Sequence, residues 1–339
     1  MLLDASLPPT SLRAIPDIAR AAEALGFKGL WCTETVHDPF LPGALIAEHT
    51  RRIQIATGIA IAFSRSPANL AYTAWDLAEA SWGRFILGLG TQVKAHIERR
   101  YGMPWPESVA GKLRDQLGAI RAFWKTWQTG APLRYQSEYY RLTLMSPFFN
   151  PGPIQFPDIP IYIAGVNTGL AQLAGEAAEG FVVHPFHSPD YLTNILRPAI
   201  ERGAEKAHRQ PAEIKLAATC FAVTNPSEES FARQQISFYA STPSYRSVME
   251  FHGWGEAANA LAALASQGRW AEMPALVDET MLRTFAVIAD PDDLAGAMLN
   301  RYKGLVDRLG LYQPFVPGER DAFWSALIDK LDEEIQSSV

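Results

Sequence analysis

Short runs of consecutive apolar residues alternate along most of the chain with segments whose apolar positions recur every three or four residues. Most of the short runs are apolar throughout, which is typical of parallel strands buried on both faces. Eight runs are predicted to be strands: Leu2–Leu7, Gly29–Thr33, Ile53–Ala62, Arg84–Leu89, Ile159–Ala164, Gly180–His184, Ile214–Val223 and Arg283–Ala289. The pattern therefore predicts a parallel sheet whose strands alternate with helices.

The segments between these runs carry the start and stop signals of helices. From Ile15 onward apolar residues recur at helical spacing, Pro16 suits a first turn and Gly26 suits the stop. Ser66 and Pro67 open another segment in the same way. Eight strand–helix units with right-handed crossovers predict a (β/α)8 TIM barrel, with a doubly wound open sheet as the alternative. The first strand lacks the Gly-x-Gly-x-x-Gly turn of dinucleotide-binding sheets, which favours the barrel.

Two segments exceed the plan of a simple barrel. Residues 134–154 are expected to form a hairpin or long loop, and residues 235–282 a helical insertion between the seventh and eighth strands. Long loops of this kind often carry function. We therefore expect one TIM-barrel domain over residues 1–339, with both segments at or beside the barrel mouth.

Composition and charge narrow the range of partners and compartments. The chain has a formal net charge of −6 and no basic block, which excludes nucleic acid as the main partner because binding to phosphates requires a clustered positive surface. No segment resembles a signal peptide or a membrane helix. Cys32 and Cys220 lie in apolar runs, where a buried free thiol is expected. These features predict a cytoplasmic protein with no membrane partner.

One strand end has the geometry of an anion site. In the stretch AGVNTG a buried strand ends at Ala164 and Gly165, and a helix is expected to begin near Thr168. The backbone N–H groups of Val166, Asn167 and Thr168 would then lie at a helix N-terminus, which attracts anions. An ordinary strand-to-helix turn with a threonine cap is the alternative.

The other strand ends offer groups that form hydrogen bonds rather than catalytic nucleophiles. The stretch GRFILGLGTQVKAHIERR leads from an apolar run into Gly90, Thr91 and Gln92. We find no lysine placed for a Schiff base, no Gly-x-Ser-x-Gly turn and no cluster of metal ligands, and we expect His184 and His187 to form a turn rather than a metal pair. Such a mouth suits a cofactor that carries its own chemistry, and we expect no metal.

Three stretches make the chain similar to a known family. IARAAEALGFKGLWCTETVHDPF, IATGIAIAFSRSPANLAYTAWDLAEASWGRFILGLGTQVKAHIERRYGMPW and PIYIAGVNTGLAQLAGEAAEGFVVHPFHSPDYL resemble the bacterial luciferase-like flavin and deazaflavin oxidoreductases, and more narrowly their coenzyme F420-dependent branch. The resemblance covers nearly the whole chain. It implies a TIM barrel that holds F420 in its mouth and transfers a hydride between F420 and a small organic substrate. Alternatives are an FMN-dependent monooxygenase, a non-catalytic flavin-binding relative and an unrelated phosphate-binding barrel.

The resemblance also implies where the cofactor binds. A non-proline cis peptide of the family matches Gly58-Ile59, the turn after the fourth strand would form a second wall, and the AGVN turn would bind the phosphate. The expected cofactor-binding residues are Gly58, Ile59, Gly90, Thr91, Gln92, Ala164, Gly165, Val166, Asn167 and His184.

The catalytic acid or base of better understood relatives is not directly inherited. Sugar-phosphate and alcohol dehydrogenating members carry a histidine and a glutamate where this chain has Thr35 and Val93. Glu34 and His37 lie nearby and are the expected catalytic residues, with Lys94 as a further candidate. A structural role within its own turn is the alternative for His37.

Aromatic and basic side chains complete the expectations. In the insertion, Tyr239, Tyr245, Phe251 and Trp254 are expected either to line a substrate pocket or to pack two short helices. Four tryptophans are expected to be exposed and to support a homodimer, unless they pack on each other: Trp75, Trp82, Trp124 and Trp127. A basic cluster is expected to bind the anionic tail of the cofactor: Lys94, His96, Arg99 and Arg100.

Overall fold

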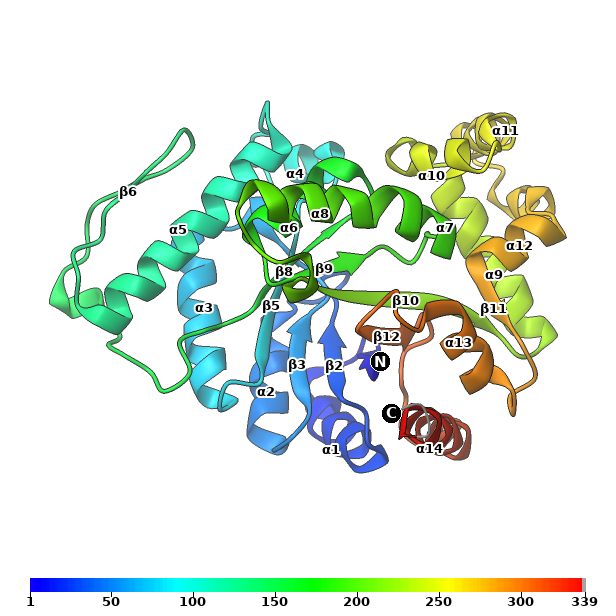
Figure 1. Cartoon of the computed structure of the whole chain (residues 1–339), viewed down its shortest axis with the longest axis horizontal. Coiled ribbons are helices and arrows are strands. Elements are labelled where there is room, and N and C mark those ends of the chain that lie inside the picture. The colour runs from blue at the N-terminus through cyan, green and yellow to red at the C-terminus, as the bar shows by residue number, and fades with distance from the viewer. Residues whose placement is uncertain (337–339) are drawn as a thin grey trace.

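The computed structural model describes residues 1–336, and it shows eight parallel strands that close into a barrel surrounded by helices (Figure 1). The last strand pairs with both its predecessor and the first, which closes the ring. In order around the barrel the strands are β1 (Leu2–Ser6), β2 (Gly29–Cys32), β3 (Gln54–Thr57), β5 (Phe85–Gly90), β8 (Ile161–Gly165), β9 (Gly180–Val183), β10 (Lys215–Val223) and β12 (Arg308–Leu311). The predicted TIM barrel is confirmed.

Helices follow the strands and carry the caps expected from the sequence. Ser66 accepts a hydrogen bond from the backbone N–H of Asn69 at the start of α3, and Gly26 ends α1 with a left-handed φ of 102°. The longer helices outside the insertion are α1 (Ile15–Leu25), α2 (Phe40–His49), α3 (Pro67–Ala80), α5 (Val109–Thr129), α6 (Thr168–Ala177), α8 (Arg197–Lys206), α13 (Leu294–Tyr302) and α14 (Asp321–Gln336). Among the described residues no helix is both long and apolar enough to cross a membrane.

The predicted closing strand is wrong. The run at 283–289 contains a short strand, β11 (Ala286–Ile288), but it pairs only with the last three residues of β10. The barrel is closed instead by β12, which begins with Arg308 and includes Gly310. A charged residue and a glycine in a four-residue strand hide the apolar pattern. Arg308 is tolerated there because its guanidinium forms a buried ion pair with Asp4.

A second predicted strand is divided. The run at 53–62 forms β3 and the two-residue strand β4 (Ala60–Ile61), which are separated by a cis peptide bond between Gly58 and Ile59. The position implied for a cis peptide by the family resemblance is therefore confirmed.

The two additional segments lie in different places. Residues 134–154 contain an antiparallel hairpin, β6 (Tyr135–Gln136) and β7 (Arg141–Leu142), which lies beside α5 (Figure 1). The insertion begins earlier than predicted, and its helices lie together on the right side of the view in Figure 1. Its helices are α9 (Pro226–Ala240), α10 (Arg246–Phe251), α11 (Gly255–Ser266) and α12 (Glu279–Phe285).

The strands separate two apolar cores. Alternate strand residues face outward and pack under the helices, while the others face the barrel interior. The interior core consists of Trp31, Ala56, Ile86, Tyr162 and Ala217, with Val182 packed against it. In the same interior the carboxylate of Asp4 binds the Arg308 guanidinium at 2.6 and 2.7 Å and accepts a hydrogen bond from the Trp31 indole at 2.8 Å.

Three of the four tryptophans expected on the surface are buried. Trp75, Trp124 and Trp127 pack on one another between α3 and α5, whereas Trp82 is 69% exposed. The expectation of exposed aromatic surface is therefore wrong for three of them, because α3 and α5 bury their apolar faces against each other. Cys32 and Cys220 are buried free thiols, as predicted.

Candidate active site

The inward-facing rows of the barrel lead directly to its mouth. Because side chains alternate along a strand, the residues two and four positions beyond each interior residue face inward as well. Five neighbouring strands, from β1 to β8, have small residues at inward positions near the mouth, here called the small-residue arc: Ser6, Thr33, Gly58, Gly90 and Ala164. The other three strands have rings at inward positions on the mouth side, here called the aromatic arc: His184, Phe221 and Tyr312.

The small-residue arc brings two of the predicted cofactor walls into contact. A Cβ atom on Gly90 would lie 2.5 Å from the Ile59 side chain, and a Cβ atom on Gly58 would lie 2.9 Å from the Trp31 ring. Trp31 is itself held by its bond to Asp4. The two glycines therefore allow neighbouring side chains to approach the backbone closely. No side chain of their own projects into the mouth at these positions.

The turn after β5 is braced by its own side chains. Gln92 has a left-handed φ of 59°, and its side-chain oxygen accepts a hydrogen bond from the backbone N–H of Val93 at 2.9 Å. The buried Thr91 hydroxyl donates to the carbonyl of Gln92 at 3.2 Å. The predicted residues Gly90, Thr91 and Gln92 thus form an ordered rim beside the arc.

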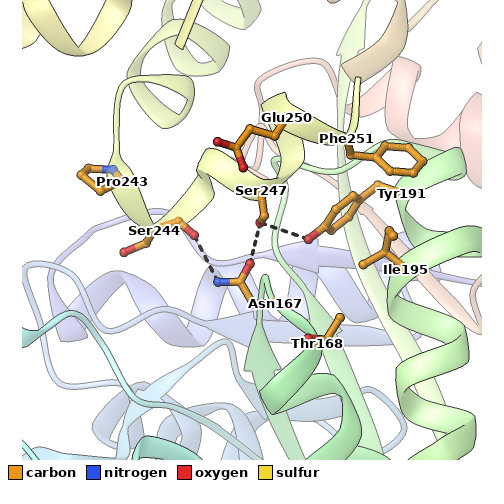
Figure 2. A pocket seen from close by; sticks show the side chains of 9 residues that line it. All are labelled: Asn167, Thr168, Tyr191, Ile195, Pro243, Ser244, Ser247, Glu250 and Phe251. Carbon is orange, nitrogen blue, oxygen red and sulfur yellow. Dashed lines mark hydrogen bonds between the residues drawn. The ribbon is translucent and has the colours of Figure 1, made fainter. Parts of the chain in front are cut away.

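The N-terminus of α6 opens into a pocket of about 630 Å³ (Figure 2). Asn167 precedes α6 without capping it, because its side chain binds the insertion instead: it donates to the Ser244 carbonyl at 3.4 Å and accepts from the Ser247 hydroxyl at 2.6 Å. Tyr191 donates to the Val166 carbonyl at 3.2 Å. The helix terminus predicted as an anion site is therefore joined to α10, and hydroxyl groups line the space above it.

Glu34 is held in place by three neighbours. Its carboxylate binds the Arg65 guanidinium at 2.6 Å and the backbone N–H of Ile61 at 2.7 Å, and it accepts a hydrogen bond from the Tyr101 hydroxyl at 3.3 Å. The side chain is only 7% exposed. Glu34 thereby ties the end of β2 to β4, the short strand that follows Gly58-Ile59.

The remaining polar residues after β2 and β5 are exposed. His37 lies in the loop before α2, while its neighbour Asp38 accepts the first backbone N–H of α2, from Phe40, at 2.8 Å. In the basic segment α4 (Lys94–Arg99), Lys94 is 3.8 Å from the Glu98 carboxylate. Arg100 donates to the carbonyl of Thr35 at 2.9 Å, so this segment is fixed to the loop after β2.

His184 is enclosed by aromatic rings on the opposite side of the mouth. Its imidazole stacks on Tyr245, with ring centroids 4.4 Å apart, and meets Tyr239 edge-on at 4.7 Å. The Nδ1 atom accepts a hydrogen bond from the backbone N–H of Phe186, so Nε2 carries the proton. Burial lowers the pKa of His184 to about 3, with a further contribution from His187, so the ring is neutral at physiological pH.

A chain of hydroxyl groups completes this side. The hydroxyls of Tyr239 and Tyr312 are 2.6 Å apart, and Tyr312 donates to the side-chain oxygen of Gln235 at 3.2 Å. The sequence reading missed Tyr312 and Gln235. The signal for Tyr312 was its place directly after a barrel strand, and it was lost because β12 was not recognised.

The aromatic residues of the insertion divide into two groups. Tyr239 and Tyr245 are half-buried beside His184, and Phe251 lines the pocket at α6. Trp254 packs on His252 and Phe285 and has a structural role. Within residues 1–336 no group of three or more His, Cys, Asp or Glu side chains is placed to hold a metal ion.

Comparisons with known proteins place the chain among related sequences and folds. An uncharacterized protein of Mycobacterium tuberculosis is 42% identical over 313 residues, covering 91% of this chain and 92% of that protein. A 5,10-methylenetetrahydromethanopterin reductase of Methanolobus tindarius is 28% identical, covering 85% and 86%. The structure of a coenzyme F420 dependent tetrahydromethanopterin reductase from Methanopyrus kandleri superimposes with a TM-score of 0.78 at 22% identity, covering 98% and 99%.

A family model provides the assignment. The model for luciferase-like monooxygenases matches residues 3–308, from β1 to the start of β12, and so includes the ends of the first seven barrel strands. This match excludes an unrelated phosphate-binding barrel. The chain belongs to the luciferase-like monooxygenase family.

Proposed function

We propose that this protein is an F420-dependent oxidoreductase that transfers a hydride between the deazaflavin and a small organic substrate. Relatives whose names or descriptions specify F420 support the choice of cofactor. The observation that carries the proposal is the small-residue arc, where Gly58 and Gly90 have no room for a Cβ atom. Such a surface fits the face of a flat tricyclic ring.

The residues present fit the cofactor in two further respects. The rim Gly90-Thr91-Gln92 would border the ring, and the N-terminus of α6 would hold the phosphate with the backbone N–H groups around Asn167 and Thr168. The hydroxyl groups of Ser244 and Ser247 line the same pocket and can add hydrogen bonds. When bound, the deazaflavin supplies a two-electron hydride acceptor or donor.

The side chains of this protein would bind, orient and shield the reactants. Glu34 is engaged by Arg65 and Ile61, so we propose that it positions the segment Gly58–Ala60 beneath the ring rather than exchanging protons. His37 is exposed and free to move a proton, and it stays our candidate acid or base from the loop after β2.

FMN is the alternative cofactor. The small-residue arc and the α6 pocket suit either tricyclic ring with a phosphate, and with FMN the protein would act as a monooxygenase. A non-catalytic flavin-binding role is the other alternative, since the family's acid-base residues are replaced by Thr35 and Val93.

A side-by-side titration with F420 and FMN, followed by ring fluorescence, tests the proposal. We expect tight binding of F420, at least tenfold weaker binding of FMN, and weak binding of the deazaflavin ring without its phosphate-bearing tail. A preference for FMN would contradict the proposal and make oxygen the next substrate to test. If the protein binds neither F420 nor FMN, both the F420-dependent oxidoreductase and the FMN-dependent monooxygenase lose their support.

A further inference from the structure

The aromatic arc is left free if the ring lies on the small-residue arc. Four side chains on this side are half-buried: His184, Tyr239, Tyr245 and Tyr312. Each of them therefore leaves part of its surface open to a molecule beside the ring.

The hydroxyl groups on this side of the mouth belong to two tyrosines, Tyr239 and Tyr312. Tyr239 on α9 contacts both His184 and Tyr312, which places all three rings on the same side of the mouth. Tyr312 donates its proton to Gln235, so Tyr239 donates to Tyr312 and keeps its own oxygen lone pairs available. Rotation of either hydroxyl would provide a donor instead. The pair can therefore bind a hydroxyl group or a carbonyl group.

The surroundings of this pair carry no charge. Among the described residues, no Asp, Glu, Lys or Arg forms a hydrogen bond or cation–π contact with His184, Tyr239, Tyr245 or Tyr312. Burial raises the pKa of Tyr312 and lowers that of His184, so both stay neutral around pH 7. A charged ligand would lose its hydration without gaining a partner of opposite charge.

We propose that Tyr239, Tyr312 and the rings of His184 and Tyr245 form the substrate subsite, and that it takes an uncharged molecule with a hydroxyl or carbonyl oxygen. Tyr312 and Tyr239 hold that oxygen, and the rings contact the carbon skeleton. The inference rests on the proposed function, because it assigns the opposite side of the mouth to the deazaflavin. It therefore assigns His184, which the family resemblance placed among the cofactor-binding residues, to the substrate instead. Phosphorylated and carboxylated substrates are excluded by it.

Ligand-observed NMR on the cofactor-free protein tests this subsite with probes of one size. Cyclohexanol and cyclohexanone are the neutral pair, and cyclohexanecarboxylate and cyclohexylamine are their charged counterparts. We expect saturation transfer to the neutral pair only. The Tyr312→Phe variant should weaken binding of both neutral probes roughly five- to tenfold, since one hydrogen bond is lost. Tyr239→Phe should have a similar effect.

The matched control is Tyr72→Phe, which removes a hydroxyl bonded to the Phe149 carbonyl on the outside of α3. It should leave probe binding unchanged. Equal or stronger binding of the charged probes, no transfer to the neutral pair, or unchanged affinity in the Tyr312→Phe variant would each overturn the proposal. Circular dichroism confirms that each variant is folded.

The outcome is separable from that of the proposed function. F420 binding is read from ring fluorescence, whereas the probes are read by NMR without cofactor. If the neutral probes depend on Tyr312 but F420 does not bind, the subsite stands and the cofactor assignment fails. If F420 binds but the affinity of the neutral probes is the same in the Tyr312→Phe variant, the substrate subsite is wrong and the cofactor assignment still holds.

Discussion

The two arcs of the barrel mouth are built from opposite kinds of residue. The small-residue arc ends five adjacent strands with glycine, alanine, serine or threonine, and its geometry comes from the backbone, as at Gly58 and Gly90. The aromatic arc carries rings on three strands, and Tyr239 and Tyr245 from the insertion pack on it. Small residues and rings thus lie side by side around one mouth.

The difference shows which part of the mouth is free to vary. The two glycines of the small-residue arc, Gly58 and Gly90, have no space for a larger side chain, since neighbouring atoms lie within 3 Å of the missing Cβ atoms. On the aromatic arc His184 and Tyr312 are half-buried, so part of each side chain faces the mouth. We therefore expect ring binding to be sensitive to small additions on one arc, and substrate choice to be sensitive to polar changes on the other.

The largest effect is expected beneath both arcs, at Asp4. The Asp4→Asn variant leaves the buried Arg308 guanidinium without its anionic partner, which costs about 3–5 kcal/mol of the free energy of unfolding. Urea unfolding measures this loss. The matched control is Asp17→Asn, whose exposed ion pair with Arg20 contributes little. An equal loss in the two variants would show that the interior pair does not support the mouth.

Acid is expected to destabilise the aromatic side selectively. Behind the arc, burial lowers the pKa of His187 to about 4, below its unfolded value near 6.5. The unfolded state then binds a proton that the folded state does not, so stability is complete above about pH 6.5 and falls as the pH approaches 4. One such histidine contributes about 3 kcal/mol, at about 1.4 kcal/mol per pKa unit.

The His187→Asn variant tests this dependence. Asparagine can still donate to the His184 carbonyl but cannot be protonated, so the loss of stability between pH 7 and acid should shrink. His96→Gln, on the exposed face of α4, should retain the full dependence. Thermal unfolding across this pH range gives the comparison, and an unchanged slope in His187→Asn would assign the acid sensitivity elsewhere.

A smaller effect is expected at the α6 end of the small-residue arc. In Gly165→Ala the new Cβ atom would lie 2.7 Å from the Leu170 Cβ atom, so the first turn of α6 must shift and phosphate binding should weaken about tenfold. Gly169→Ala, in the same first turn of α6, meets no atom within 4 Å and serves as control. F420 titration measures both. Equal F420 affinity in the two variants would show that the phosphate does not bind at this helix terminus.

The smallest effect is expected outside both arcs. Trp82 is exposed and has a left-handed φ of 57°, which asparagine also tolerates. Trp82→Asn should change the free energy of unfolding by less than about 0.5 kcal/mol and leave F420 affinity unchanged. A loss above this range at low protein concentration would show that Trp82 is covered in an assembly. The expected homodimer stays a prediction.

Much of the barrel was predictable because most strands are continuous apolar runs with capped helices between them. The cis peptide and the glycine turns were implied by family resemblance at Gly58-Ile59 and Gly90. β12 was not predictable in this way, since Arg308 is neutralised only by Asp4, which lies about three hundred residues away along the chain. Tyr312 was lost with it.

The candidate site was predictable only where one segment supplies it. The α6 terminus follows from the AGVN turn alone, but its contact with Ser247 joins residues 80 positions apart. The partners of Glu34 likewise come from two other segments, residues 61–65 and Tyr101, and only the folded chain shows that its carboxylate is engaged. Periodicity reports burial within a segment and contains no information on such contacts.

The division of the mouth is tested most directly by one F420 titration of two variants, Gly90→Ala and Tyr312→Phe. A Cβ atom on Gly90 must displace Ile59 from beneath the ring, so F420 affinity should fall about tenfold in Gly90→Ala. Tyr312→Phe should bind F420 like the unmodified protein. Loss of affinity in Tyr312→Phe with none in Gly90→Ala would contradict the account and place the ring on the aromatic arc.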